Sequence, residues 1–207
     1  KGYQVLLKDK NDEGLARGIK YQQDNWDKKV QRKHMSNYQR NINTSRVIGL
    51  TDDMPSVQQH LKKTDLIIEA VFEDLVLKQK IVADMEALTN PHTIFATNTS
   101  AIPIANIAAK AKRPENIIGM HYFSPVPSMP LLEIIPHTGT SEAAIATAYE
   151  VGAKQGKTCI VVKDVPGFYV NRCLGPYLIE VSALVRDGVG LEQLDKAIVN
   201  FGMPVGP

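Results

Sequence analysis

A histidine and a glutamate stand in a stretch of sequence that is otherwise apolar. Residues 116–136, NIIGMHYFSPVPSMPLLEIIP, predict two short strands, Ile117–Tyr122 and Leu131–Ile135, joined by a loop whose prolines stop either strand from continuing. Glu133 lies among leucines and isoleucines, where burying a lone carboxylate is costly, so the sequence predicts a partner for it. The nearest polar candidate is His121, and an imidazole held by a buried carboxylate can serve as a general base. A surface glutamate and a satisfied core histidine would explain the same residues structurally.

Further apolar runs predict the strands that must position this pair, and segments with helical periodicity alternate with them. Such alternation is typical of a doubly wound α/β fold, so the sequence predicts a Rossmann-like, mostly parallel sheet. The additional strands are predicted at Tyr3–Lys8, Val47–Leu50, Thr64–Phe72, Thr93–Thr97 and Lys157–Val162, and the helices at Leu75–Leu88, Pro103–Ala111 and Ser141–Gln155.

Polar residues stand at the carboxyl ends of four of the predicted strands. They are Asp9, Glu73, the run Asn98–Ser100, and His121. In doubly wound sheets, ligands bind outside the carboxyl ends of the strands. The sequence therefore predicts that these polar residues line one site.

Asp9 suggests what that site binds. An acidic residue after the second strand of a dinucleotide-binding fold hydrogen-bonds the adenosine ribose and disfavours a 2′-phosphate. If Tyr3–Lys8 is that second strand, the first strand and its Gly-rich GxGxxG loop are missing from this sequence and are expected upstream of residue 1, because the motif does not occur in it. A turn residue beside Lys8 and Lys10 is the alternative interpretation of Asp9.

Composition limits the class of protein and divides the chain. A net charge of +2 argues against a dedicated nucleic-acid binder, and no apolar run approaches the length of a membrane span. Residues 12–46 are long and polar with sparse apolar positions, which predicts a helix pair projecting from the body. The two cysteines, Cys159 and Cys173, lie in apolar surroundings and are predicted to be small buried hydrophobic residues.

A boundary is predicted near Asp164, where the strand-rich composition gives way to a turn and then to helical patterns. Residues 1–164 would form the first domain. Residues 165–207 would begin an all-α domain, with helices at Phe168–Arg186 and Leu191–Phe201.

Five segments in a fixed order carry a family resemblance. DLIIEAVFEDLVLKQKI, FATNTSAIPI, IIGMHYFSPV, LLEII and VVKDVPGFYVNR resemble the L-3-hydroxyacyl-CoA dehydrogenase family, over essentially the whole chain, and within it the multifunctional enzymes of fatty-acid oxidation. The resemblance implies NAD-dependent oxidation of a 3-hydroxyacyl-CoA thioester, with no metal ion. It also implies a role for each matching residue.

In the roles that the resemblance implies, His121 is the catalytic base and Glu133 its carboxylate partner. Ser100 contacts the substrate hydroxyl, and Asn171 reaches the active site from the second domain. Ser124 stands where the single-function dehydrogenases carry asparagine, and the multifunctional branch usually carries serine. The implied NAD-site residues are Asp9, which binds the ribose, Ala70, Val71, Glu73 and Lys78, which line the site, and Asn98, which lies beside the nicotinamide.

The resemblance also bears on substrate and partners. The basic residues Lys28, Lys29, Arg32 and Lys33 could meet the phosphates of coenzyme A, or could simply form a solvated helix face. The implied assembly is a homodimer or a β-oxidation multienzyme complex with a thiolase subunit, associated peripherally with a membrane. The implied compartment is the mitochondrion, with the peroxisome as the alternative.

Two other functions stay open from the sequence. One is another β-hydroxyacid or nucleotide-sugar dehydrogenase on the same sheet, in which a lysine is the usual base. The other is a catalytically silent protein with a structural role, since a fold can outlast its chemistry. The presence together of His121, Glu133, Ser100 and Asn171 argues against the silent protein.

Overall fold

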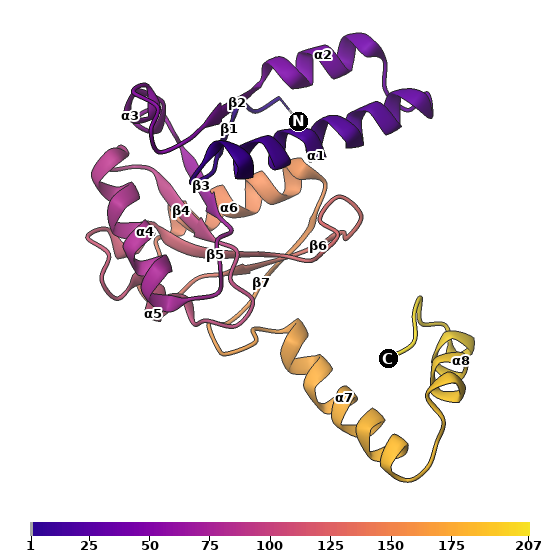
Figure 1. The fold of residues 1–207 in the computed structure, drawn as a ribbon. Coiled ribbons are helices and arrows are strands. Elements are labelled where there is room, and N and C mark those ends of the chain that lie inside the picture. The colour runs from indigo at the N-terminus through magenta and orange to yellow at the C-terminus, as the bar shows by residue number, and fades with distance from the viewer. Residues whose placement is uncertain (1) are drawn as a thin grey trace. The chain divides into compact units, whose positions relative to one another are not determined.

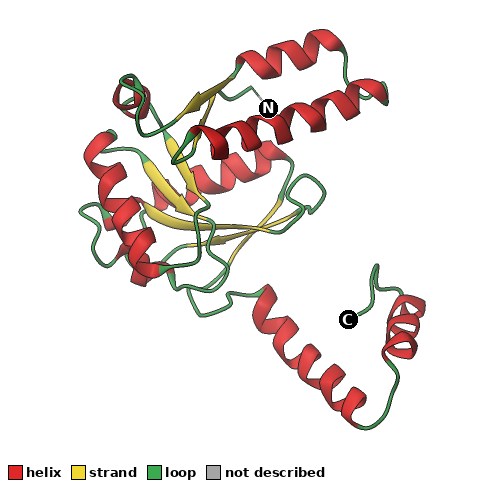
Figure 2. Ribbon diagram, viewed as in Figure 1, coloured by secondary structure: helices red, strands yellow, loops and turns green. Residues whose placement is uncertain are grey.

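The strands of the computed structural model, which describes residues 2–207, form two sheets (Figures 1 and 2). Lys1, the first residue of the predicted first domain, lies outside the described residues. The chain divides into two compact units. The first unit is Lys1–Ile67 with Ala83–Thr93, and the second is Ile68–Val82 with Ile94–Pro207.

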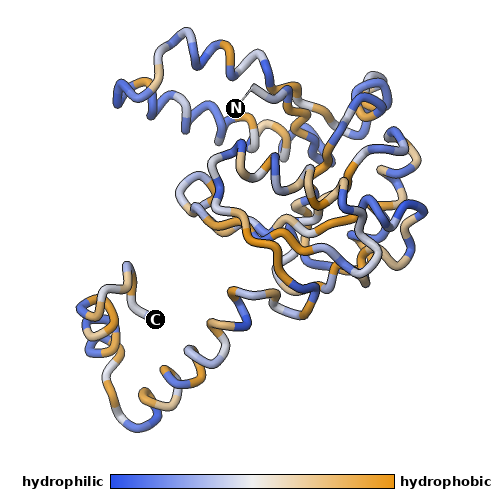
Figure 3. The backbone as a smooth tube through the Cα atoms, turned by 180° about the vertical axis from the view of Figure 1, so that it is seen from behind, coloured by the Kyte–Doolittle hydropathy of each residue, from blue (hydrophilic) through white to orange (hydrophobic). Residues whose placement is uncertain are grey.

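The first unit is built on a parallel pair of strands, β1 (Val5–Lys8) and β2 (Val47–Leu50). Two helices, α1 (Asp12–Gln31) and α2 (Asn37–Ser45), connect them, as residues 12–46 predict. The tube in Figure 3 is largely hydrophilic along this pair. A five-residue helix, α3 (Val57–Leu61), follows β2 and was not predicted, because one short turn carries too little periodicity to recognise.

Side chains at the helix ends explain where the helices of the first unit begin. Asn11 accepts a hydrogen bond from the Gly14 amide at 2.9 Å and caps α1. Ser36 and Gln39 form a reciprocal capping box at the start of α2. The small core of the unit consists of Leu50, Val57 and Leu61, with Leu6, Ile48, Met54, Met85 and Leu88 packed against them.

The second unit contains a five-stranded sheet in the order β3 (Leu66–Glu69), β4 (Ile94–Thr97), β5 (Ile117–Tyr122), β6 (Leu131–Ile135) and β7 (Thr158–Val161). The mostly parallel sheet is confirmed, since β4 pairs parallel with β5, β6 pairs parallel with β7, and only the β5–β6 pairing among those described is antiparallel. Strand β3 ends three residues earlier than predicted. The reason is that the Glu69 side chain accepts a hydrogen bond from the Val71 amide and turns the chain out of the sheet.

Helix α4 (Leu75–Leu88) has its first part, up to Val82, in this unit and its remainder in the first. The other helices of this unit up to β7 are α5 (Ile104–Ala108), a 3-10 turn at Pro114–Asn116, and α6 (Glu142–Gln155). Helix α6 contacts β5, β6 and β7, and α5 contacts β5. A Cβ on Gly119 would lie 2.8 Å from Ile104 Cδ1 and 2.9 Å from Ile135 Cβ, so only glycine lets α5 and β6 approach β5 this closely. Strands β4 to β6 carry the core: Ile94, Phe95, Ala96, Ile117, Ile118, Met120, Leu132, Ile134 and Ile135 are all buried.

Two further helices, α7 (Val170–Arg186) and α8 (Leu191–Phe201), end the chain, as predicted from the apolar periodicity. Helix α7 has no buried residue, so the prediction that both cysteines are buried was wrong for Cys173, which is exposed; Cys159 is half-buried. Within the described part of the chain, no helix combines the length and the apolar character that a membrane span requires.

Candidate active site

His121 and Glu133 face each other as register partners in the antiparallel pair β5–β6. The His121 Nδ1 atom lies 2.7 Å from the Glu133 Oε2 atom. His121 is 5% exposed and Glu133 is fully buried. The two side chains that the sequence paired are therefore in contact, in the buried part of the sheet.

The second oxygen of the Glu133 carboxylate is bound by the start of α7. Its Oε1 atom accepts hydrogen bonds from the backbone amides of Tyr169 and Val170, at 3.0 and 2.9 Å. The amino end of a helix carries unpaired N–H groups and a partial positive charge, so it stabilises an anion. The carboxylate thus has a partner on both oxygens, which is what a buried charge requires.

These contacts decide which imidazole nitrogen is free. An ionised carboxylate only accepts hydrogen bonds, so His121 Nδ1 must carry the proton that it donates to Glu133. The lone pair is then on Nε2, which is the atom able to accept a proton from a substrate. Two aromatic rings hold the imidazole plane: the Phe123 centroid lies 4.5 Å from that of His121, and the Phe168 centroid 5.8 Å.

Phe168 reaches the imidazole through an uncommon backbone conformation. Its φ is +48° and that of Gly167 is +76°, so the chain turns sharply between β7 and α7. A bulky residue at positive φ is strained and persists only where the surroundings favour it. Phe168 is 1% exposed, and the burial of its ring beside His121 provides that compensation.

Ser100 and Asn171 meet each other in the same unit, although 71 positions separate them. Asn171 Nδ2 donates to the Ser100 carbonyl oxygen at 3.1 Å. Both residues are exposed, which leaves the Ser100 hydroxyl accessible. The turn that contains Ser100 is fixed by Glu73, whose Oε1 atom accepts from the amides of Ser100 and Ala101 at 2.9 and 3.1 Å and from the Thr99 hydroxyl.

The surroundings of Glu73 favour its charged form. Partial burial by itself raises the pKa of Glu73, but the Thr99 hydroxyl, the Ser100 and Ala101 amides and the positive charge of Lys78 outweigh it, so that the pKa lies below its usual value of 4.5. Glu73 is therefore an anion at neutral pH, and it holds the Ser100 turn through charge-assisted hydrogen bonds.

The lowered pKa predicts how stability depends on pH. Because the folded state binds a proton at Glu73 less readily than the unfolded state, the contribution of Glu73 to the free energy of unfolding is present above pH 4.5 and is lost as the pH falls through the lowered pKa. Glu73→Gln has no such titration. We expect the difference in free energy of unfolding between wild type and Glu73→Gln, measured by urea denaturation, to shrink as the pH is lowered from about 6 to about 3. A difference that stays constant over this range would contradict the assignment.

The remaining predicted residues of this unit lie around the same strand ends. Asn98 follows β4, and its Oδ1 atom accepts from the Tyr122 amide at 2.8 Å, which ties the ends of β4 and β5 together. Ala70 and Val71 follow β3 and are exposed, and so is Ser124, which follows β5. Lys78, which is predicted to line the cofactor site, is 0% exposed, and its ammonium lies 2.9 Å from the Glu69 carboxylate.

The other predicted residues belong to the first unit. Asp9 follows β1, is exposed, and accepts a hydrogen bond from the Lys10 amide at 2.7 Å through one of its two oxygens. A Cβ on Gly14 would lie 2.3 Å from Asp9 Oδ1, so the start of α1 approaches this carboxylate closely. The basic residues Lys28, Lys29, Arg32 and Lys33 are all exposed around the end of α1.

Sequence reasoning missed Glu69, which is 4% exposed and binds Lys78. The signal was present: Glu69 interrupts the apolar run LIIEAVF just as Glu133 interrupts LLEII, and an acid in such a run needs a partner. Sequence reasoning also used Asp164 only as a domain boundary. Its carboxylate accepts from the Ile104 and Ala105 amides at 2.7 and 2.8 Å, and so fixes the segment between β7 and α7 to the start of α5.

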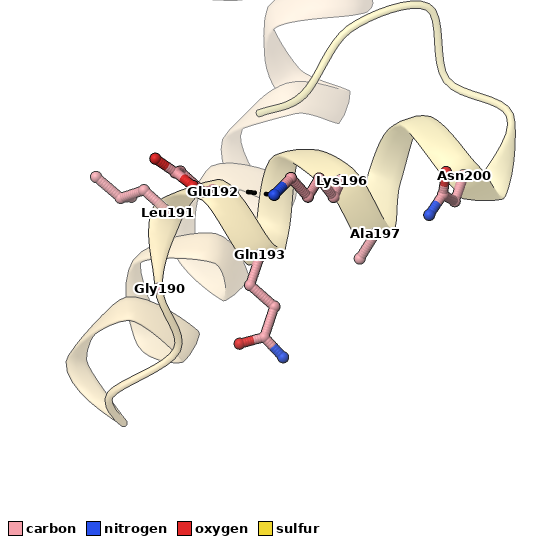
Figure 4. A pocket seen from close by; sticks show the side chains of 7 residues that line it. All are labelled: Gly190, Leu191, Glu192, Gln193, Lys196, Ala197 and Asn200. Atoms are coloured by element: carbon pink, nitrogen blue, oxygen red, sulfur yellow. Dashed lines mark ion pairs between the residues drawn. The ribbon is translucent and has the colours of Figure 1, made fainter.

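A separate pocket of about 790 Å³ lies on α8 and is lined by side chains between Gly190 and Asn200 (Figure 4). Two of the lining residues, Lys196 and Glu192, form an exposed ion pair at 3.9 Å. None of the predicted site residues lines this pocket. Among residues 2–207, the His, Cys, Asp and Glu side chains form no group of three that could hold a metal ion.

Residues 1–165 match the NAD binding domain of 3-hydroxyacyl-CoA dehydrogenase, and residues 167–207 match the C-terminal domain of the same enzyme. Among curated proteins, the chain is 50% identical over 206 residues to the fatty acid oxidation complex subunit alpha of Idiomarina loihiensis. The match covers 100% of this chain and 28% of that protein, so the chain spans less than a third of its relative's length.

Solved structures of the same kind superimpose on the whole chain. The 3-hydroxybutyryl-CoA dehydrogenase of Escherichia coli K12 gives a TM-score of 0.92 at 34% identity, covering 100% of this chain and 43% of that one. The (S)-3-hydroxybutyryl-CoA dehydrogenase of Ralstonia eutropha gives a TM-score of 0.92 at 32% identity, covering 100% of this chain and 72% of that one. Both of these proteins are named for the same substrate class.

Proposed function

Because the chain belongs to the 3-hydroxyacyl-CoA dehydrogenase family, we propose that it carries the NAD-binding and catalytic part of an enzyme that oxidises (S)-3-hydroxyacyl-CoA to 3-ketoacyl-CoA in fatty-acid oxidation. The observation that carries the proposal is the contact between His121 and Glu133, with Nε2 left as the proton acceptor. The alternative of a β-hydroxyacid or nucleotide-sugar dehydrogenase that uses a lysine as its base has no comparable support. Lys78, which lies near the ends of the strands in the second unit, is buried and paired with Glu69.

The chemistry at His121 follows from this geometry. When bound, NAD supplies the group that accepts the hydride leaving the C3 atom of the substrate. His121 Nε2 takes the proton of the C3 hydroxyl as the hydride leaves C3, because loss of the proton alone would leave a high-energy alkoxide and loss of the hydride alone a high-energy protonated ketone. The imidazolium that results is stabilised by the Glu133 carboxylate, 2.7 Å from Nδ1. Ser100 and Asn171 orient the substrate oxygen and the imidazole, a contribution of the positioning type.

Each of the two units, taken separately, contains residues whose chemistry fits NAD binding. The exposed Asp9 keeps one carboxylate oxygen available for the ribose hydroxyls and would repel a 2′-phosphate. The exposed segment Ala70–Glu73 and the strand end at Asn98 are where a nicotinamide ring would lie against backbone and apolar side chains. On the substrate side, Ser124 would contribute a polar contact to the thioester. Lys28, Lys29, Arg32 and Lys33 would meet the coenzyme A phosphates.

We assign the full-length protein to a multienzyme complex. Support comes from the curated relative, which is named as the alpha subunit of a fatty acid oxidation complex and of which this chain covers 28%. Three more specific proposals follow from the sequence resemblance. The full-length protein forms a homodimer or binds a thiolase subunit, and the complex associates peripherally with a membrane. Within the family, the protein is of the same type as the mitochondrial trifunctional enzyme α-subunit. The mitochondrion, or alternatively the peroxisome, remains the proposed compartment, although this relative is bacterial.

The test is made on the full-length protein with NAD and (S)-3-hydroxybutyryl-CoA or a longer homologue. We expect formation of NADH together with the 3-ketoacyl-CoA product, and a lower rate when NADP replaces NAD. A protein that binds NAD but forms no NADH with acyl chains of any length would refute the enzyme and favour a structural role. Turnover of 3-hydroxyacids that lack coenzyme A, with none of the thioester, would instead favour another β-hydroxyacid dehydrogenase.

A further inference from the structure

Asp164 attaches the segment between β7 and α7 to the rest of the second unit. The two oxygens of its carboxylate accept hydrogen bonds from the Ile104 and Ala105 amides, at 2.7 and 2.8 Å. These are the first two amides of α5, which has no side-chain cap of its own at that end. The first amides of a helix have no partner within it, and a carboxylate binds such N–H groups more strongly than a neutral acceptor does. Asp164 therefore fixes one end of the segment to a helix that lies about 60 positions earlier in the sequence.

The other end of the same segment is fixed at Asn171, whose Nδ2 atom donates to the Ser100 carbonyl oxygen at 3.1 Å. Residues 164–171 are thus joined at both ends to residues 100–105. Between these attachments the chain turns sharply, with φ of +76° at Gly167 and +48° at Phe168. A bulky residue keeps a positive φ only where its surroundings impose it, so attachment at both ends supports the turn in addition to the burial of the Phe168 ring.

The turn places three groups against the catalytic pair. The Phe168 ring lies with its centroid 5.8 Å from that of His121. The next two amides, those of Tyr169 and Val170, donate to Glu133 Oε1 at 3.0 and 2.9 Å. The position of these groups depends on the course of the chain that leads to them from Asp164.

We propose that Asp164 is a positioning residue for the catalytic base. Its carboxylate holds the chain against the start of α5, and the turn that follows brings the Tyr169 and Val170 amides onto Glu133, which orients His121. Asp164 therefore acts on the base through the chain that follows it. The inference rests on the proposed function for the role of His121.

Variants of the full-length protein test this role by kcat for the 3-hydroxyacyl-CoA and by the NAD dissociation constant. Asp164→Ala removes both acceptor oxygens, and Asp164→Asn keeps one. We expect kcat to fall by about 10- to 100-fold in Asp164→Ala and by less in Asp164→Asn, as displacement of a positioned group does, with NAD affinity close to that of wild type. Asp84→Ala is the matched control, since Asp84 is exposed on α4, and it should stay within about 2-fold of wild type. Wild-type kcat in Asp164→Ala would overturn the proposal, and so would a loss of NAD affinity as large as the loss of kcat.

A double-mutant cycle with Glu133→Gln tests whether Asp164 acts through Glu133. Asp164→Ala should lower kcat in the wild-type background but add no more than about 3-fold in the Glu133→Gln background, where the carboxylate that it positions is already absent. Effects that multiply independently in the combined variant would overturn the proposal.

Hydrogen exchange gives a readout that does not depend on activity. The Ile104 and Ala105 amides lose their acceptor in Asp164→Ala, so they exchange faster whether Asp164 positions the base or only caps α5. Positioning predicts in addition that the Tyr169 and Val170 amides, beyond the turn, exchange at least about 10-fold faster than in wild type. The amides of β5, paired within the sheet, report global unfolding and should keep their wild-type exchange.

Wild-type exchange at Tyr169 and Val170, or an equal acceleration in β5, would show that Asp164 contributes to folding alone and would overturn the proposal. If Asp164→Ala does not fold, Asp164→Asn gives the same comparison, because asparagine retains a good helix-capping oxygen. A wild-type protein that forms no NADH would refute the proposed function instead, and the exchange rates would still decide whether Asp164 fixes the start of α7.

Discussion

Replacement of His121 by glutamine should lower kcat by about 10²–10⁴-fold and leave the affinity for NAD close to that of wild type. Glutamine is similar in size and polar, so it fills the space between Phe123 and Phe168, but its amide cannot accept a proton at neutral pH. The loss is therefore expected in the proton-transfer step and not in binding. The measurements are kcat from NADH formation and the NAD dissociation constant from titration of the full-length protein.

A matched control is available for this variant. His92 is exposed, in the turn before β4, and His92→Gln makes the same chemical change away from the strand ends that carry the site. That variant should retain wild-type kcat within about 2-fold. If His121→Gln retains a comparable kcat, His121 is not the base, and the function proposed for this chain loses the observation on which it depends.

Glu133→Gln should lower kcat by about 10²–10⁴-fold, as removing the carboxylate that orients a catalytic histidine does in other enzymes. The expected cause is the tautomer of His121. If the oxygen of the introduced amide accepts from Tyr169 and Val170, as the carboxylate does, the NH₂ group of that amide must point at His121 Nδ1. Nδ1 then becomes the acceptor, the imidazole proton moves to Nε2, and the atom that should take the substrate proton already carries one.

The opposite orientation of the amide is no better, because its NH₂ group would then face two backbone N–H donors. The first orientation keeps these hydrogen bonds but loses the negative charge at the start of α7, and the second loses the hydrogen bonds as well, so we also expect a lower thermal midpoint for Glu133→Gln. Glu150→Gln is the control: Glu150 is exposed on α6 and its neutral replacement should change neither kcat nor the midpoint appreciably. A Glu133→Gln protein with kcat within about 3-fold of wild type would show that the carboxylate does not set the tautomer.

Glu133 also links the two predicted domains at the level of single atoms. One of its oxygens binds the base on β5, and the other binds the first two amides of the segment that opens α7. The orientation of the imidazole is therefore set by the start of the helical region as well as by the sheet. The Asn171–Ser100 hydrogen bond joins the same two regions at the substrate side.

The sequence by itself determined the elements and one contact of the site. The strands, the longer helices and the helix pair follow from the periodicity of apolar residues, because a side chain's burial repeats with the geometry of its own element. The pairing of His121 with Glu133 followed as well, since an acid surrounded by apolar residues requires a partner and only one stood nearby.

Only the tertiary structure decided the rest of the site. The same reasoning identified no partner for Glu69, because nothing in the sequence places Lys78 beside β3 or shows that Lys78 is buried. Glu133 accepts hydrogen bonds from the amides of Tyr169 and Val170, which lie 36 and 37 positions later in the sequence. Asn171 donates to Ser100, which lies 71 positions earlier. Such contacts depend on how separate elements pack, which local periodicity does not encode.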